Sequence, residues 1–283
     1  MKKQISAIWP RSEPLLLGNL LTFRKELEML ADLHQTDKAV LFFDLPLEQI
    51  KSQVPYLEEA LKSSLAIELT FSPSLPFVFD WPPRDFPINT WSYGSLKRIS
   101  LLAQISSQHP ILSWPASIQA EAKSYYLQLQ KGFAKLITLH LKQQKGGAEE
   151  SNADFTQWIP FIKRHPQDRF ILLGHDEMPK DLCALPNTVL AKQLHLSLAT
   201  QLALCGASDA FMGMASGICS AAIFSQTPYV IFKHPKHHPE EMAFELGSSK
   251  RFTFSKPKQQ LWRQLDSLEN LTTALISLKE SSL

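Results

Sequence analysis

The fold of this chain is decided by residues 198–235, LATQLALCGASDAFMGMASGICSAAIFSQTPYVIFKHP. Their apolar and small residues predict five consecutive elements: a helix at 198–205, a strand at 207–212, a tight turn at 213–217, a helix at 216–225 and a strand at 228–232. This order is one repeat of a doubly wound parallel sheet. The turn follows the carboxyl end of a strand, and sheets of this kind bind their ligands there.

The remainder of the chain alternates in the same way. Apolar runs predict further strands at 4–9, 39–43, 66–71, 110–114, 136–141, 169–173, 188–191 and 251–254. Amphipathic runs predict helices at 20–34, 49–63, 90–107, 118–131, 155–164 and 240–246, and a pair of helices within 258–279. We expect the helix at 20–34 on the surface, because charged residues separate its apolar ones.

The alternation predicts an α/β protein with two Rossmann-like domains, each built on a parallel sheet, that face each other across a cleft. We place an N-terminal domain at 1–133 and a C-terminal domain at 134–283, and we allow the last helix to pack back on the first domain. The most linker-like segment is KGGAEESN at 145–152, which has two glycines and no apolar anchor.

Composition excludes several classes of protein. The 283 residues are 44% hydrophobic and carry a net charge of +2, which is typical of a soluble globular protein. No stripe of Lys and Arg with interleaved aromatics is present, so we expect no nucleic-acid partner. No apolar run is long enough to span a membrane, and the N-terminus has no apolar signal core. We therefore expect a cytoplasmic protein, with peripheral membrane contact left open.

The three cysteines, Cys183, Cys205 and Cys219, are few and far apart, so we expect them to be reduced. Cys219 lies just inside the helix after the turn, where a thiolate could be stabilised. Its small neighbours Ser220 and Ala221 favour packing over a role as nucleophile.

The turn carries the first candidate site residues. Gly213 and Gly217 would let a ligand approach the backbone, and free N–H groups at the start of the next helix attract anions. Ser216 can cap that helix and donate a hydrogen bond to a phosphate. A capped helix that only packs on the sheet explains the same residues. The spacing is not GxGxxG and lacks the lysine of a Walker loop, which argues against a dehydrogenase or a P-loop ATPase.

Basic residues follow two of the predicted strands. Lys233, His234 and Lys236 come after the last strand of the quoted stretch, which opens on the same sheet edge as the turn, so they would face an anionic ligand. A solvated basic loop is the alternative. Lys142 follows the strand LITLHL and could reach a phosphate, although a lone lysine at a strand end is more often solvated.

The run HPKHHPEE at 234–241 contains three histidines and two carboxylates, which are residue types that bind metals. His237 and His238 are adjacent and point apart on any regular element, and the spacing HxH is absent. We expect neither a metal nor another cofactor.

The quoted stretch resembles the C-terminal domain of GT-B-fold glycosyltransferases, and most of all that of heptosyltransferases and fucosyltransferase-like proteins. The strands ITLHLK and RFILLGHDEMP are similar to the strands that precede it in those families, and the resemblance covers about residues 136–246. Two departures are visible. Met214-Ala215 stands where heptosyltransferase-like sequences usually carry an Asp or Thr, and Lys142 stands where fucosyltransferase-like sequences usually carry Arg.

The resemblance implies a nucleotide-diphosphate sugar donor, held by the C-terminal domain. Gly213, Ser216 and Gly217 would surround the diphosphate, and Lys142 would lie near it, with Lys233 and His234 on the same edge. It further implies a metal-independent glycosyltransferase of cell-surface polysaccharide biosynthesis, with a glycan or a lipid-linked sugar as acceptor.

The expected mechanism follows from charge. Negative charge builds on the departing diphosphate, and helix-end N–H groups, Ser216 and lysines would stabilise it in place of a metal. A carboxylate or imidazole of the N-terminal domain would deprotonate the acceptor hydroxyl. The candidate bases are Glu13 in the first loop and Asp80 or Asp85 in the proline-rich segment 72–89, of which one at most would act.

Two other functions stay open at this point. One is a non-catalytic nucleotide-sugar-binding or scaffolding protein of the same fold, which the altered turn and the lack of an evident base would explain. The other is a sugar-nucleotide epimerase, which shares the two-domain fold.

Overall fold

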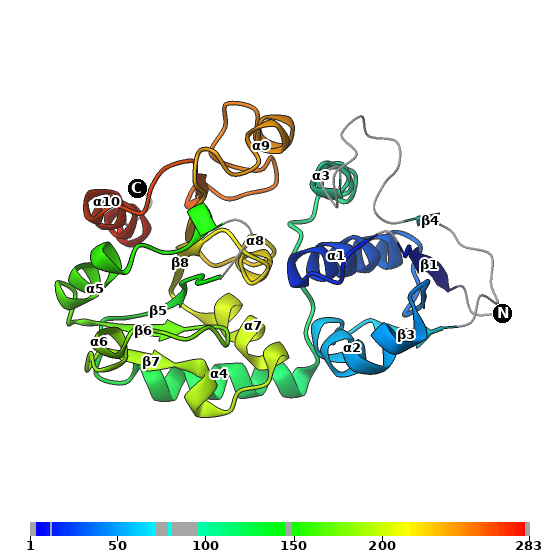
Figure 1. The fold of residues 1–283 in the computed structure, drawn as a ribbon. Helices are drawn as coiled ribbons and strands as arrows, with labels where there is room; N and C mark the ends of the chain where they lie inside the picture. The colour runs from blue at the N-terminus through cyan, green and yellow to red at the C-terminus, as the bar shows by residue number, and fades with distance from the viewer. Residues whose placement is uncertain (1–3, 12, 72–78, 81–94, 145–148, 281–283) are drawn as a thin grey trace. The chain divides into compact units, whose positions relative to one another are not determined.

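The computed structural model describes residues 4–11, 13–71, 79–80, 95–144 and 149–280 (Figure 1). The chain forms two compact units, of which the first comprises Met1–Ala116 and Phe252–Phe254 and the second comprises Ser117–Arg251 and Ser255–Leu283. The boundary expected at residue 133 lies inside the second unit, and as a division between functional domains it stays a prediction. No helix in the described ranges is both long and apolar enough to cross a membrane.

The first unit contains a parallel sheet, whose described strands have the order β3-β2-β1-β4. Its strands are β1 (Ile5–Trp9), β2 (Lys38–Phe43), β3 (Ala66–Thr70) and β4 (Phe79–Asp80). Its helices are α1 (Leu17–Leu33), α2 (Leu47–Ala60) and α3 (Ser95–Ser106). The core lies between α1, α2 and the two central strands, and it is built around the buried rings of Trp9, Phe23 and Phe43.

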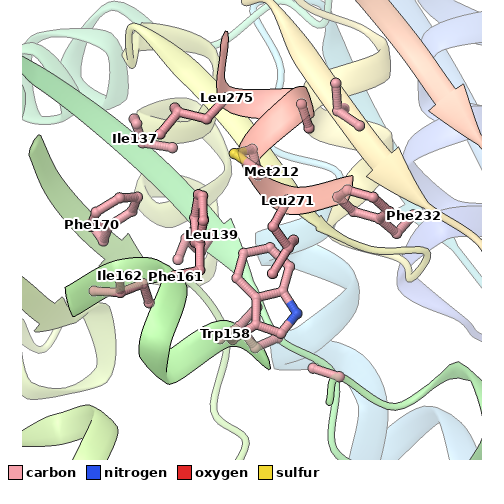
Figure 2. Packing of buried hydrophobic residues seen from close by; sticks show 14 of the residues in the cluster. Ile137, Leu139, Trp158, Phe161, Ile162, Phe170, Met212, Phe232, Leu271 and Leu275 are labelled. Atoms are coloured by element: carbon pink, nitrogen blue, oxygen red, sulfur yellow. The ribbon is translucent and has the colours of Figure 1, made fainter. Parts of the chain in front are cut away.

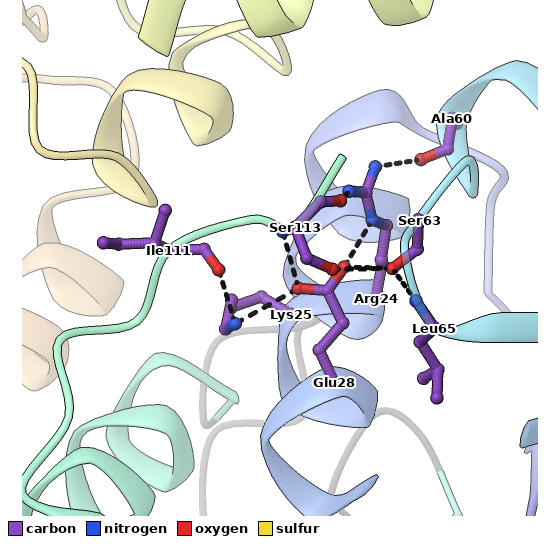
Figure 3. A network of polar contacts seen from close by, with 8 residues as sticks. All are labelled: Arg24, Lys25, Glu28, Ala60, Ser63, Leu65, Ile111 and Ser113. Atoms are coloured by element: carbon purple, nitrogen blue, oxygen red, sulfur yellow. Dashed lines mark hydrogen bonds and ion pairs between the residues drawn. The ribbon is translucent and has the colours of Figure 1, made fainter. Parts of the chain in front are cut away.

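The prediction of a surface position for α1 is wrong. Its charged residues Arg24, Lys25 and Glu28 are buried, and the Arg24 side chain is 0% exposed. They are paired with one another, because Glu28 accepts hydrogen bonds from Arg24 Nε at 2.8 Å and from Lys25 Nζ at 3.1 Å (Figure 3). A charged residue can leave water when it finds an opposite charge and hydrogen bonds, so a charged pattern along a helix does not by itself place that helix on the surface.

The prediction of a strand at 110–114 is also wrong. This segment pairs with none of the described strands, and its backbone groups bond to side chains of α1 instead (Figure 3). Lys25 Nζ donates to the Ile111 carbonyl at 2.6 Å, Arg24 donates to the Ser113 carbonyl, and the Ser113 N–H donates to Glu28 at 3.1 Å. These bonds satisfy backbone groups that a sheet would otherwise have to satisfy.

The second unit contains a larger parallel sheet, whose described strands have the order β10-β9-β8-β5-β6-β7. The strands are β5 (Lys135–His140), β6 (Asp168–Leu172), β7 (Thr188–Leu190), β8 (Ala210–Met214), β9 (Tyr229–Phe232) and β10 (Gln259–Trp262). The helices are α4 (Ala116–Gln130), α5 (Phe155–Lys163), α6 (Lys180–Cys183), α7 (Leu198–Ala207), α8 (Cys219–Ile223), α9 (Pro239–Leu246) and α10 (Leu268–Lys279).

This strand order is that of dinucleotide-binding sheets. Counted from β5 as the first strand, it reads 3-2-1-4-5-6, with the order reversing between β5 and β8. All pairings are parallel, as right-handed strand-helix-strand connections require. The predicted α/β fold with parallel sheets is confirmed.

One face of this sheet carries the main core of the unit (Figure 2). Ile137 and Leu139 of β5 enter it together with Trp158 of α5, and Leu271 and Leu275 of α10 cover them. The apolar face of α10 is therefore buried within the second unit, and the expectation that this helix also packs back on the first domain stays a prediction.

Two further predictions near the C-terminus are wrong. Residues 251–254 form bends and turns, and the stretch expected to begin a helix at 258 contains the edge strand β10. The buried side chain of Gln259 fixes this strand, since its Nε2 donates to the carbonyls of Ser225 at 2.8 Å and Thr227 at 3.0 Å. A buried glutamine is read as a surface residue in a sequence, so the short polar strand QQLW is missed.

Candidate functional site

The carboxyl ends of β5, β8 and β9 lie side by side at the point where the strand order of the second sheet reverses. Lys142 comes two residues after β5, the turn 215–217 follows β8, and Lys233 follows β9 directly. Three segments that the sequence singled out therefore meet at one edge of the sheet, which is where sheets of this order hold ligands.

The structure moves Gly213 from the predicted turn into strand β8. It lies in register with His140 of β5 and Ile231 of β9. A Cβ atom at this position would lie 2.4 Å from the His140 carbonyl oxygen. Glycine is required here because two backbones approach closely, and not because a ligand does.

The turn after β8 contains Ala215, Ser216 and Gly217, all of them partly exposed. Helix α8 begins at Cys219 and is five residues long, so the predicted helix at 216–225 is shorter than expected. The Ser216 side chain does not cap it. Its Oγ lies 3.7 Å from Cys219 Sγ, which is a weak partner, so the hydroxyl can bond a ligand at little cost.

The thiol of Cys219 is a packing group. Burial raises its pKa to about 11, and the Sγ donates to the Met214 carbonyl at 3.1 Å. The thiol stays protonated at neutral pH, so it is a poor nucleophile. The other two cysteines, Cys183 and Cys205, are also free.

Lys233 is the unusual residue of this edge. It is only 8% exposed, yet its ammonium group makes no hydrogen bond or ion pair with any residue that the structure describes. Burial lowers the pKa of Lys233 to about 8; the negative charge of Glu241 acts against this, while the charges of Lys142 and Arg263 add to it. A buried cation without a bonded counter-ion destabilises a fold, so its presence favours a role in binding an anion.

Lys142 adds a second ammonium group to the same place. It is half-buried, burial lowers its pKa, and the carboxylates of Glu150 and Asp176 partly restore it. Within the described part of the chain its ammonium group has no hydrogen-bonded or ion-paired partner. The positive charge of Lys142 lowers the affinity of Lys233 for its proton, and two ammonium groups without a partner among the described residues favour the binding of an anion.

The basic loop after β9 is not simply solvated. His234 is partly exposed, and its Nδ1 accepts a hydrogen bond from the Lys236 N–H at 3.2 Å. His237 lies 3.1 Å from the Glu150 carboxylate, and His238 lies 3.4 Å from that of Glu241. In the described residues, no group of three or more His, Cys, Asp or Glu side chains is placed to hold a metal ion.

Of the candidate bases in the first unit, Glu13 is the best described. It follows β1, and its backbone carbonyl accepts a hydrogen bond from Trp9 Nε1 at 3.1 Å. The carboxylate oxygen Oε2 is buried without a hydrogen-bond partner among the described residues, and partial burial raises the pKa of Glu13. A carboxylate of raised pKa is the form that serves as a general base.

Of the other two candidates, Asp80 is described by its backbone alone. Asp80 ends strand β4, which pairs with β1 in the register Ile8 to Asp80, so Glu13 and Asp80 follow neighbouring parallel strands. The side chain of Asp80 and the whole of Asp85 lie outside the described residues.

Arg263 is a basic residue at this edge of the sheet that the sequence did not single out. It directly follows β10, is exposed, and contributes its positive charge to the surroundings of Lys233. It was missed because residues 258–265 were expected to be helical. The order of an apolar pair, Leu261-Trp262, followed by a basic residue is the signal that could have found it.

Comparison with solved structures identifies the fold. The chain is similar to a glycosyl transferase family 9 protein from Veillonella parvula DSM 2008, with a TM-score of 0.53, 11% identity, and 100% of this chain and 92% of that chain covered. It is also similar to the E. coli heptosyltransferase WaaC with ADP, with a TM-score of 0.53, 9% identity, and 98% and 100% covered. WaaC with ADP-2-deoxy-2-fluoro heptose gives a TM-score of 0.51 at 10% identity, with 98% and 100% covered.

Sequence comparison gives no such relation, since no protein-family model and no curated protein matches the chain. The similarity is carried by the arrangement of strands and helices, and it extends over nearly the full length of both chains. The fold of this chain is therefore that of the heptosyltransferase-like glycosyltransferases, in agreement with the resemblance found in its sequence.

Proposed function

We propose that this protein is a glycosyltransferase that takes a sugar from a nucleotide-diphosphate donor bound to its second unit. The donor diphosphate would lie at the carboxyl ends of β5, β8 and β9, between Lys142, Ser216 and Lys233. The observation that carries the proposal is the buried side chain of Lys233, whose ammonium group has no partner among the described residues and lies in the field of the Lys142 charge. The fold shared with glycosyltransferases supports it.

The chemistry follows from the charges. When the bond between sugar and diphosphate breaks, negative charge grows on the departing phosphate oxygen. Ammonium groups held in a poorly solvated site stabilise that charge more strongly than they would in water, which lowers the barrier to transfer. We propose that Lys142 and Lys233 supply this stabilisation without a metal ion, and that Gly217 and His234 line the same site.

We propose Glu13 as the base that accepts the proton of the acceptor hydroxyl. Its buried, unpartnered Oε2 and its raised pKa support this role. Asp80 and Asp85 remain the alternatives. The acceptor would be a glycan or a lipid-linked sugar of cell-surface polysaccharide synthesis, reached from the cytoplasm, with the two units facing each other across a cleft and with contact at the membrane surface.

The first experiment is a donor screen. The protein is incubated with ADP-, UDP- and GDP-sugars, and thermal stability and nucleotide release are followed. We expect stabilisation by one class of donor and its loss in Lys233→Met. The matched control is Lys135→Met, which removes an exposed lysine from the amino end of β5 at the opposite edge of the same sheet.

The outcomes separate the possible functions. Stabilisation by a nucleotide without release or transfer would indicate a binding protein of the same fold. Conversion of the donor sugar without an acceptor would indicate an epimerase. No response to any donor would exclude a nucleotide-sugar function altogether.

Two substitutions test the assigned roles. Ser216→Ala should weaken nucleotide binding by about 1.5–3 kcal/mol, the range for a lost hydrogen bond to a charged group. Glu13→Gln should leave nucleotide binding unchanged and lower the rate of transfer by about 10²- to 10⁴-fold, as expected for the loss of a general base.

A further inference from the structure

The peptide group that joins Lys142 to Gln143 is held by hydrogen bonds on both sides. Its carbonyl oxygen, which belongs to Lys142, accepts from the Ala153 N–H at 2.9 Å. Its N–H, which belongs to Gln143, donates to Asp176 Oδ2 at 3.0 Å. Lys142 lies two residues beyond the end of β5, so these two bonds do for its backbone what strand pairing does within the sheet.

The two partners of this peptide group come from different parts of the second unit. Ala153 lies two residues before α5, at the end of the loop that begins at Lys142. Asp176 lies 33 positions from Gln143, in the turn that follows β6. Since β5 and β6 are neighbours in the sheet, the Asp176 carboxylate connects the loops at the carboxyl ends of two adjacent strands.

The turn after β6 is itself firmly held before it reaches Asp176. Gly174 adopts a φ of 100°, and a Cβ there would lie 3.2 Å from Ile218 Cδ1 and 3.3 Å from the His140 ring. The Gly174 N–H donates to Oε1 of the buried Gln201 at 2.9 Å, and His140 Nδ1 lies 3.2 Å from the Leu173 carbonyl oxygen. Close packing and a left-handed residue together leave this turn little freedom.

The backbone of Asp176 is held as well. Lys192 Nζ donates to the Asp176 carbonyl oxygen at 3.2 Å, and it lies 3.1 Å from the carboxylate of Glu177, whose side chain is 95% exposed. Such an exposed ion pair contributes little by itself. The bond to the carbonyl fixes Asp176 in the turn, and the carboxylate of Asp176 then reaches Gln143 from a fixed base.

A carboxylate at this edge of the sheet needs an explanation, because its charge alone would repel a diphosphate. The hydrogen bond to Gln143 gives one that does not depend on charge. A lysine whose backbone is already held in place loses less conformational freedom when its ammonium group binds a ligand, and this raises affinity.

We propose that Asp176 is a positioning residue of the donor site, which holds the peptide group after Lys142 so that the Lys142 ammonium group is directed to the donor diphosphate. Asp176 acts through the backbone of the lysine and does not need to touch the donor. This inference rests on the proposed function, because it assumes that the diphosphate binds at Lys142.

The test is a calorimetric titration of two Asp176 variants and the wild-type protein with ADP, UDP and GDP. Asp176→Ala removes the acceptor of the Gln143 N–H and should weaken binding about three- to tenfold, the range for one hydrogen bond. Asp176→Asn keeps an acceptor oxygen but removes the charge, so it should bind as tightly as wild type or more tightly. Glu177→Gln removes a charge from the same turn and should leave the affinity unchanged.

A double-mutant cycle shows whether the effect passes through Lys142. In the Lys142→Met protein, Asp176→Ala should have almost no further effect on nucleotide affinity, because the side chain that it positions is gone. A general loosening of the second unit would weaken binding in both backgrounds alike.

A second readout does not depend on a ligand. The amide proton of Gln143, followed by NMR, should exchange with solvent faster in Asp176→Ala than in wild type, and Asp176→Asn should restore slow exchange. Equal exchange in all three proteins would show that the bond to Gln143 does not form, and the inference would be wrong.

The binding data separate this inference from the proposed function. If wild type binds a nucleotide and Asp176→Ala binds it equally well, or if Asp176→Asn is as weak as Asp176→Ala, Asp176 does not position Lys142 and the proposed function stands. The same conclusion follows if Asp176→Ala weakens binding equally with and without Lys142. If no protein of the set binds any of the three nucleotides, both are wrong.

Discussion

Helix α1 of the first unit and the carboxyl edge of the sheet in the second unit both remove charged side chains from water, but they treat them differently. On α1, Arg24 and Lys25 share the carboxylate of Glu28 and donate to three backbone carbonyls. At the sheet edge, Lys233 is nearly as buried and has no bonded counter-ion among the described residues.

The difference separates structure from function. A buried charge whose partners belong to the same fold is satisfied by that fold, and removing one partner leaves the others unpaired. A buried charge without such a partner lowers stability until something else supplies it. The first arrangement indicates a charge cluster with a structural role, and the second favours a site that binds an anion.

The largest expected effect falls on α1. Burial by itself raises the pKa of Glu28, but Arg24, Lys25 and the Ser63 hydroxyl bring it below its ordinary value. Glu28→Gln leaves two buried cations without a counter-ion and should lower the free energy of unfolding of the first unit by about 3–5 kcal/mol, measured in urea. The exposed pair Lys38–Glu68 is the control, and Glu68→Gln should cost at most about 1 kcal/mol.

The pH dependence gives the same prediction an independent check. Because the pKa of Glu28 is lower in the folded than in the unfolded protein, its contribution to stability is present above the unfolded pKa and is lost as pH falls through the folded pKa. The penalty of Glu28→Gln should therefore shrink in acid. If the loss of stability in Glu28→Gln does not depend on pH, packing and not charge explains the contribution of Glu28.

At Lys233 we expect the opposite effect, an increase in the free energy of unfolding. Lys233→Met removes a buried charge that has no partner among the described residues and should stabilise the nucleotide-free protein by about 1–3 kcal/mol, while it abolishes nucleotide binding. The folded pKa of about 8 lies below that of an unfolded lysine, so the unfolded chain holds more protons between the two values. The gain should be full below about pH 8 and vanish above about pH 10. If Lys233→Met is less stable than the wild-type protein, the contrast between Lys233 and the paired charges of α1 is wrong.

Gly213 tests whether a residue of the quoted stretch belongs to structure or to function. Gly213→Ala should lower stability by about 1–3 kcal/mol, because its Cβ would meet the backbone of β5. Gly206→Ala is the matched control within α7, where a Cβ would be 3.6 Å from Ser225 Cβ, and it should be neutral or stabilising by up to about 1 kcal/mol. If Gly213→Ala has normal stability but fails to bind nucleotide, Gly213 contributes to ligand binding and is not required by the packing of the sheet.

The smallest effect is on the pH dependence of binding. The affinity for a nucleoside diphosphate should fall roughly tenfold between about pH 7.5 and about pH 9.5 as Lys233 loses its proton. Lys233→Arg keeps its charge throughout this range and should give a flat profile. A wild-type profile that is equally flat would indicate that Lys233 does not contact the phosphates.

Features that depend on the spacing of apolar residues, and on where a residue lies relative to a strand, were mostly predicted from the sequence. Apolar runs and their spacing placed the strands of both sheets except β4 and β10, and the rule that ligands lie at carboxyl ends brought Lys142, Ser216 and Lys233 to one edge. The failures share a cause, which is burial of polar residues. Arg24 and Glu28 were read as a solvated face, and Gln259 hid the strand β10 whose end carries Arg263. Partners distant in sequence decide such burial, and no local pattern contains them.

The prediction for Gly213 was wrong for a related reason. A glycine near a predicted turn was assigned to a ligand, whereas the cause of its presence lies in His140, 73 positions earlier along the chain and next to it in the sheet. The pairing of Glu150 with His237 was not foreseen either, because it joins two loops across an intervening strand.

The position of β5 in the middle of its sheet also has a consequence for synthesis on the ribosome. Its neighbour β6 emerges soon after it, but its other neighbour, β8, begins about seventy residues later. At a translation rate of roughly 5–20 residues per second, one edge of the apolar strand LITLH stays open for roughly 4–14 s in every nascent chain. An unpaired apolar edge can join another chain, so this interval is when the protein most needs protection from aggregation.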